Sequence, residues 1–158
     1  MPSNQVINVV VAGLGGQGVL KASGILADAV FRAGLDVKKS EIHGMSQRGG
    51  SVSSDVRFGQ RVYSPMVPMG QADYLVVLAP SQVEVARPML KAGGVLIQPS
   101  LIDETRLGNK KSLNVALLGA LARHLDIADN LWHAAITAAL PEKLHPANLQ
   151  AFAMGRNA

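Results

Sequence analysis

The sequence predicts an α/β protein built on a single open sheet, mostly parallel with one antiparallel element, and completed by a helical C-terminal extension. Continuous β-branched runs, typical of strands buried on both faces, alternate with segments of helical spacing. Hydrophobic residues make up 48% of the chain but aromatics only 4%, so the predicted core is aliphatic and suits close packing of helices on a sheet. The 158 residues are enough for one such domain.

The first predicted unit is a strand, a turn and a helix. Ile7 to Ala12 is a β-branched run that predicts a buried strand, and Gly13 to Gly18 turns the chain. Val19 to Ala33 then places its apolar residues at helical spacing. Gly34 is positioned to end this helix.

An antiparallel element is predicted after this unit. Residues 35–42 form the second predicted strand. Apolar and polar residues alternate from Ser51 to Phe58, which predicts a half-buried strand whose polar face includes Asp55 and Arg57, placed to pair with each other. Residues 61–63 are predicted to return as a short strand after a turn at 59–60.

The rest of the chain predicts one more strand–helix–strand unit and then helices. Tyr74 to Ala79 and Val95 to Gln98 are the strands, with a helix predicted over Gln82 to Lys91. Further helices are predicted at 112–125, 130–140 and 148–155. The chain therefore reads as one Rossmann-like domain, residues 1–158, with an α/β core (1–111) and a helical extension (112–158).

The composition excludes several kinds of site. The chain has no cysteine, so it cannot hold a thiolate-bound iron–sulfur cluster or use a cysteine nucleophile. The basic residues behind the net charge of +4 are scattered rather than set in a stripe with aromatics, which argues against nucleic acid binding. No apolar stretch reaches the roughly 18 residues of a membrane span, and we find no secretion signal. We expect a cytoplasmic chain.

Two glycine-rich loops carry the functional signal. Gly13, Gly15 and Gly18 match G-x-G-x-x-G between a strand and a helix, where backbone N–H groups can cradle a phosphate. Gly16 lies within this loop, and Gln17 offers a polar side chain at the start of the helix. A dinucleotide site also needs an acid after the second strand, where the candidate is Glu41 beside Lys38 and Lys39, which suit a phosphate instead. The alternative is a tight turn that binds no nucleotide.

The second loop runs from His43 to Gly50 and follows the second predicted strand. In an open α/β sheet this position is beside the first loop, so the two would frame one crevice. Arg48 can hold a phosphate or carboxylate through two hydrogen bonds, or form a salt bridge at a subunit interface. His43, Ser46 and Gln47 add polar groups, and Gly49 permits close approach of a ligand.

The combination of GLGGQG with SEIHGMSQRGGSVSSDVRFG resembles the gamma-type domain of 2-oxoacid:ferredoxin oxidoreductases, particularly its indolepyruvate branch. Asn114 with Leu118-Gly119-Ala120, and Asn148 with Ala151-Phe152, resemble the C-terminal helices of the same domain, so the likeness covers essentially the whole chain.

This resemblance implies a subunit of an enzyme that oxidatively decarboxylates an aryl 2-oxoacid with coenzyme A and passes electrons to ferredoxin. Thiamine diphosphate and the iron–sulfur clusters would belong to larger partner subunits, and the present chain would supply neither catalytic residues nor a metal site. It would cover the catalytic cleft and help to bind coenzyme A. The implied contact residues are Gly13, Gly15, Gly16, Gln17, Gly18, His43, Ser46, Gln47, Arg48 and Gly49.

Two other functions stay open at this point. One is a stand-alone NADP- or nucleotide-binding protein, favoured by the first loop and the Lys38-Lys39 pair. The other is a purely architectural subunit that binds nothing small. Met66 and Met69 could form an apolar contact surface or serve as core filler.

Overall fold

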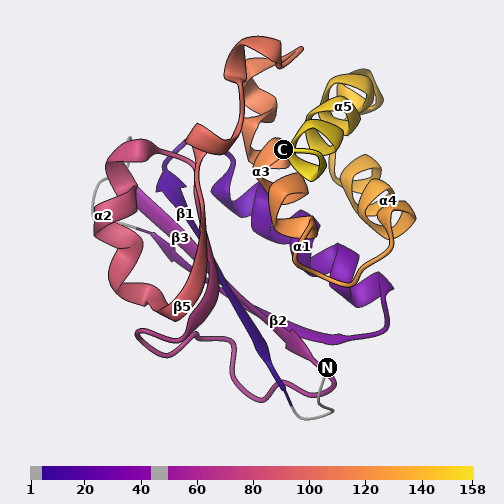
Figure 1. Cartoon of the computed structure of the whole chain (residues 1–158). Helices are drawn as coiled ribbons and strands as arrows, with labels where there is room; N and C mark the ends of the chain where they lie inside the picture. Colours follow the sequence, from indigo (N-terminus) through magenta and orange to yellow (C-terminus); the bar gives the residue numbers. More distant parts are fainter. Residues whose placement is uncertain (1–4, 44–49) are drawn as a thin grey trace.

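The structure is a computed structural model that describes residues 5–43 and 50–158 (Figure 1). Within these residues, five strands form one sheet in the order β2-β3-β1-β4-β5. The strands are β1 (Ile7–Leu14), β2 (Asp36–His43), β3 (Ser51–Gly59), β4 (Ala72–Val77) and β5 (Leu90–Ile97). The predicted open sheet is confirmed.

The antiparallel element is β3, which runs opposite to both of its neighbours, β1 and β2. The β1–β4 and β4–β5 pairs are parallel. Only a few residues join β2 to β3, and short connections favour antiparallel neighbours. As a result β3 lies between β1 and β2, which are adjacent in an ordinary dinucleotide-binding fold.

The helices divide unequally between the two faces of the sheet (Figure 1). On one side, α1 (Val19–Arg32) and α3 (Leu113–Ala122) pack on the strands, and α4 (Asp129–Ala139) and α5 (His145–Arg156) pack outside them. They enclose the larger core. On the other side, the helical cover in the described residues is α2 (Val83–Ala86) with its flanking 3-10 turns, over a much smaller core.

The C-terminal helices meet at two glycines. A Cβ at Gly155 of α5 would overlap the backbone oxygen of Ala116 in α3, and a Cβ at Gly119 would overlap that of Phe152. The two helix backbones are therefore in direct contact. The predicted helical extension is confirmed, and Trp132 of α4 is fully buried there, with its ring centre 5.5 Å from that of Phe152.

Two predicted elements are wrong. Residues 61–63 form no strand, because the backbone N–H of Val62 donates to Asp36 Oδ2 (2.7 Å) instead of entering a ladder. The predicted helix over 82–91 is only a short α2 between 3-10 turns at Pro80–Gln82 and Arg87–Met89, and β5 already starts at Leu90. Both of those turns contain a proline near their start, a residue that has no N–H to donate.

The middle of β3 is buried on both faces rather than on one. Ser54, Asp55 and Val56 are all buried, and Asp55 is only 3% exposed. The expected pairing of Asp55 with Arg57 is also wrong: Asp55 Oδ2 accepts from the N–H of Val67 (2.9 Å), and Arg57 Nε donates to Asn8 Oδ1 (2.8 Å). Burial raises the pKa of the Asp55 carboxyl, against the opposing effects of the Val67 N–H and the Arg57 charge.

Candidate functional site

The first glycine loop is a tight turn from β1 into α1. Gly18 occupies the N-cap of α1 with φ 82°, a left-handed conformation that favours glycine, and glycine has no side chain with which to cap the helix. A Cβ at Gly13 would lie 2.8 Å from Gln17 Oε1 and 2.9 Å from Val19 Cγ2. The turn therefore depends on glycine, and among the described residues no side chain caps the first N–H groups of α1.

Gln17 braces this turn from within. Its Oε1 accepts a hydrogen bond from the N–H of Leu14 (2.7 Å), and its Nε2 donates to the carbonyl of Leu78, just beyond β4, at 3.5 Å. The amide thus connects the end of β1 to the chain after β4. In this conformation its principal partners are backbone groups of the chain itself.

A pocket of about 410 Å³ opens beside the turn. Its walls come from the glycine turn, the first turn of α1, the chain after β4, the 3-10 turn Lys110–Ser112 and the start of α3. The lining residues are Gly16, Gln17, Gly18, Lys21, Leu78, Lys110, Lys111, Leu113 and Asn114.

The charged side chains that line this pocket, here called the lysine pocket, are all positive. Lys21, Lys110 and Lys111 line it together with no acidic residue. Lys21 Nζ donates to the carbonyl of Ala139 (3.2 Å), whereas neither Lys110 nor Lys111 forms an ion pair within the described part of the chain. Asn114 Nδ2 donates to the carbonyl of Gly18 (3.2 Å) and joins α3 to the glycine turn. Ammonium groups around a helix N-terminus make a site suited to phosphates.

Gly50, at the end of the second loop, contacts the first loop. The N–H of Gly15 donates to the carbonyl of Gly50 (3.0 Å), and Ser51 pairs with Leu14 in the sheet. The backbone of His43 ends β2 opposite Val52. The predicted contact residues Ser46, Gln47, Arg48 and Gly49 lie outside the described residues.

The residues that motivated a dinucleotide site lie on β2, which β3 separates from β1 and its glycine turn. Glu41 Oε1 is 3.0 Å from Lys39 Nζ, and Lys38 Nζ is 4.0 Å from Asp36 Oδ1. None of these side chains lines the lysine pocket. The geometry gives no support to the ribose-binding acid of a dinucleotide fold.

Sequence reasoning missed the cationic wall of the pocket, which consists of Lys21, Lys110 and Lys111, and the contact of Asn114 with the glycine turn. Lys21 belongs to the predicted helix Val19 to Ala33, and Lys110 and Lys111 lie outside the two glycine-rich loops from which the site was predicted. A usable signal was the sequence Lys110-Lys111-Ser112-Leu113-Asn114, a basic pair directly before a helix.

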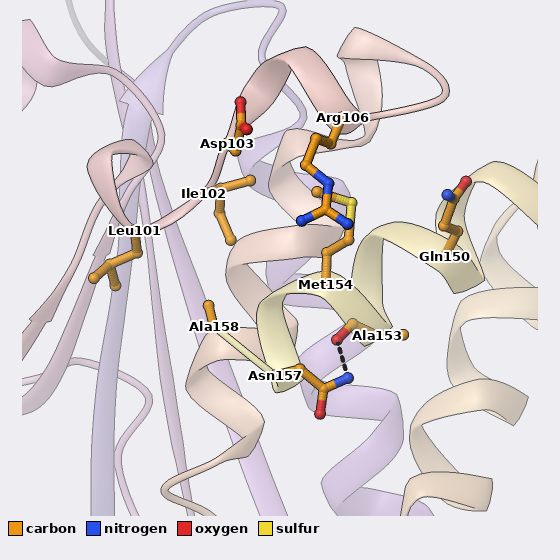
Figure 2. Close-up of a pocket in the computed structure, with 9 residues that line it drawn as sticks. All are labelled: Leu101, Ile102, Asp103, Arg106, Gln150, Ala153, Met154, Asn157 and Ala158. Atoms are coloured by element: carbon orange, nitrogen blue, oxygen red, sulfur yellow. Dashed lines mark hydrogen bonds between the residues drawn. The ribbon is translucent and has the colours of Figure 1, made fainter.

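A second hollow, of about 420 Å³, lies between residues 101–106 and α5 (Figure 2). Arg106 extends over Met154, while Asn157 Nδ2 donates to the carbonyl of Ala153 (2.9 Å). Its one cationic side chain shares the lining with Asp103, so the charge is balanced. We therefore regard the lysine pocket as the candidate site.

In the described ranges, no three histidine, aspartate or glutamate residues gather as metal ligands, and no helix is long and apolar enough to cross a membrane.

Comparison with known proteins identifies the family. The pattern of the pyruvate ferredoxin/flavodoxin oxidoreductase family matches residues 8–105, more than half of the chain. The chain belongs to this family. The indolepyruvate oxidoreductase subunits IorB of Thermococcus kodakarensis and Pyrococcus horikoshii are each 34% identical to it, over 94% of this chain and 93% of theirs. The resemblance inferred from the two loops is confirmed: this oxidoreductase-family chain is a homologue of the small subunits of 2-oxoacid:ferredoxin oxidoreductases.

Solved structures agree on the fold. The gamma subunit of a keto/oxoacid ferredoxin oxidoreductase from Geobacter sulfurreducens superposes with a TM-score of 0.81 at 25% identity, covering 96% of both chains. The 2-oxoglutarate:ferredoxin oxidoreductase from Magnetococcus marinus, solved with 2-oxoglutarate, coenzyme A and succinyl-CoA bound, gives 0.82 at 21% identity. In that case 98% of this chain corresponds to 31% of the longer one, so the same fold occurs within a larger polypeptide.

Proposed function

We propose that this chain is the non-cluster subunit of a thiamine-diphosphate-dependent oxidoreductase that converts an aryl 2-oxoacid, of the indolepyruvate kind, to an acyl-CoA and passes the electrons to ferredoxin. Larger partner subunits would hold thiamine diphosphate and the iron–sulfur clusters. For the clusters the reason is that this chain has no cysteine to ligate them. The indolepyruvate relatives support the choice of substrate. A cytoplasmic location stays a prediction.

The lysine pocket carries the second part of the proposal, which is that this chain helps to bind coenzyme A. Coenzyme A is a polyanion with a diphosphate and a further phosphate on its ribose. The glycine turn at the start of α1 and the side chains of Lys21, Lys110 and Lys111 line one pocket, and Lys21 Nζ also donates to the carbonyl of Ala139. Its volume of about 410 Å³ suits the phosphates and adjoining groups rather than the whole molecule.

The role of these residues would be binding and orientation. The lysines neutralise phosphate charge, the glycine turn lets the backbone approach the phosphates, and Gln17 keeps that turn in place through Leu14 and Leu78. His43, Ser46, Gln47, Arg48 and Gly49 stay predicted contacts with coenzyme A or with the active site of the partner. The chain would also cover the cleft in which the partner performs the chemistry.

The test compares two lysine pairs in the assembled enzyme. Lys110→Ala/Lys111→Ala should raise the Michaelis constant for coenzyme A by about tenfold, from two partly exposed phosphate contacts worth up to about 1 kcal/mol each. Lys38→Ala/Lys39→Ala on β2 is the matched control and should leave it unchanged. The difference in the Michaelis constant for coenzyme A between wild type and the Lys110/Lys111 variant should shrink at high salt.

Each alternative makes a different prediction. A stand-alone NADP-binding protein requires the β2 pair to control dinucleotide binding by the isolated chain. A purely architectural subunit requires both double variants to leave the Michaelis constant for coenzyme A unchanged. An unchanged constant in the Lys110/Lys111 variant would therefore reject the coenzyme A proposal.

A further inference from the structure

The α2 side of the sheet is thinly covered and apolar. Its small core comprises Val10, Val67, Ala72, Leu75, Val77 and Val83, whereas two layers of helices cover the opposite face (Figure 1). Most of the large apolar side chains that are exposed in the described residues belong to this side or to the chain that crosses it. These are Ile42, Tyr63, Met66, Met69 and Val85.

The segment from residue 60 to residue 71, here the 60–71 connection, crosses this face between β3 and β4 without helix or strand. Polar side chains of β2 and β3 hold it at three points. Asp36 accepts from the N–H of Val62 (2.7 Å), and Asp55 accepts from the N–H of Val67 (2.9 Å). Arg57 donates to the carbonyl of Ser64 (2.9 Å). The backbone is fixed although it lacks regular structure.

Around these anchors the connection presents large apolar side chains to solvent. Tyr63 is 82% exposed, Met66 55% and Met69 72%. The interpretation of Met66 and Met69 as core filler is therefore wrong. Because the backbone is already held, ordering it on contact with another protein costs little conformational entropy. Tyrosine is enriched among the residues that dominate binding energy at interfaces, and methionine adapts to irregular surfaces.

The same face also has a hollow, and Asp55, which anchors Val67 of the connection, is one of its lining residues. A pocket of about 220 Å³ has Asp55 and Ser53 from β3, Ile42 from β2, and Val85, Ala86 and Met89 from the α2 region among its lining residues. Its walls are mostly apolar, so it can receive an apolar side chain from a partner. The exposed side chains and the hollow together form a surface with both projections and a recess.

The charges on this face select the kind of partner. Lys38 and Arg57 are opposite each other in the β2–β3 register, on the same side of the sheet as Ile42 and Ser53, and Arg61 is exposed nearby. The carboxylates Asp36 and Asp55 accept from backbone N–H groups, and Asp36 also lies 4.0 Å from Lys38 Nζ. Glu84 of α2 pairs with Arg87, whereas Arg57 and Arg61 form no ion pair in the described part of the chain, which leaves an excess of positive charge. A second copy of this chain would bring basic groups against basic groups, whereas a partner with carboxylates around an apolar patch would complement them.

We propose that the α2 side of the sheet, with Tyr63, Met66 and Met69 at its centre, is the surface that docks onto the larger subunit of the oxidoreductase. The partner would present apolar sockets ringed by carboxylates. This inference rests on the proposed function, because it names the surface by which this subunit joins its complex.

The experiment compares variants of the complex made by co-producing this chain with the thiamine-diphosphate- and cluster-bearing subunit. Tyr63→Ser/Met66→Ser/Met69→Ser should raise the dissociation constant of the complex by at least about tenfold. Phe31→Ser/Leu101→Ser removes apolar side chains that are also exposed (67% and 48%) but lie on α1 and after β5, and should leave it within about twofold. Hydrogen exchange on the wild-type complex should show new protection of amides in residues 60–71, and this readout decides the matter if the triple variant is unfolded.

The outcomes separate the two proposals. If the triple variant binds with wild-type affinity, and residues 60–71 gain no protection in the wild-type complex, the docking surface is overturned and the subunit assignment stays intact. A wild-type chain that binds no such subunit overturns both. Self-association of the isolated chain that the triple variant abolishes would show that the occupant is a second copy, which also overturns the proposal.

Discussion

Replacing Gly155 by alanine should separate the two C-terminal helices. The new Cβ would overlap the carbonyl oxygen of Ala116 and lie 2.8 Å from both Ala116 C and Ala120 N, whereas ordinary contacts begin near 3.4 Å. All of these atoms belong to the backbone of α3, so no side-chain rotation relieves the overlap. Helix α5 must move outward as a unit.

The cost follows from what α5 carries. Phe152 packs on the fully buried Trp132, and its carbonyl lies against Gly119 of α3, so a shift of α5 loosens contacts on two sides. Overpacking of this kind costs about 3 kcal/mol or somewhat more. For a chain of this length, that lowers the melting temperature by roughly 6 to 12 °C.

The assay is thermal unfolding followed by circular dichroism and by the fluorescence of Trp132, the sole tryptophan. Gly24→Ala is the matched control, because Gly24 lies inside α1 with nothing within 4 Å of the position of a Cβ. This change should stabilise the protein by about 0.5–1 kcal/mol through the better helix propensity of alanine. A Gly155→Ala variant that melts within about 2 °C of wild type would refute the backbone contact between α3 and α5.

Two further changes test the site and the sheet. Gly18→Ala should destabilise the protein by about 2–3 kcal/mol, because φ is 82° and a Cβ would lie 2.5 Å from Asn114 Nδ2, whose hydrogen bond to Gly18 would break. Gly34 has φ 87° but open space around it, so Gly34→Ala should lose only the stability that the left-handed conformation costs alanine. If denaturant titrations showed equal losses of unfolding free energy for Gly18→Ala and Gly34→Ala, the Asn114 contact would be contradicted. Asp55→Asn should become increasingly stabilising relative to wild type as pH rises above 3.8, the ordinary aspartate value. Burial raises the pKa of Asp55 in the folded state, so its contribution to stability is full below that value and is lost as pH rises through the folded pKa. Unfolding free energies at pH 4 and pH 8 check this, and a stability difference independent of pH would count against it.

Elements with a local signal were predictable from the sequence. The β-branched run of β1 and the helical spacing of apolar residues in α1 indicate which residues are buried, and both elements form as expected. Elements that depend on distant partners were not. Arg61 to Tyr63 has strand-like composition, yet Asp36 of β2 takes the N–H that a ladder would use.

The candidate site divides in the same way. The glycine turn is encoded by neighbouring residues, so its place between β1 and α1 was predictable. The cationic wall is not local, because Lys110 and Lys111 join the turn only when α3 packs beside α1 and Asn114 bonds to Gly18. A basic pair in a polar stretch gives no indication of which loop it will face.

The walls of the lysine pocket come from segments that are far apart in the sequence, and this determines how a bound ligand should affect the stability of the protein. Its walls belong to the β1–α1 turn, the chain after β4 and the start of α3, which only the finished fold brings together. A polyanion bound there would stabilise the native state as a whole, by about 2.7 kcal/mol at a ligand concentration one hundred times the dissociation constant. Binding would thus be coupled to cooperative unfolding, and amides in β1 and α3, far apart in the sequence, would gain protection from exchange together.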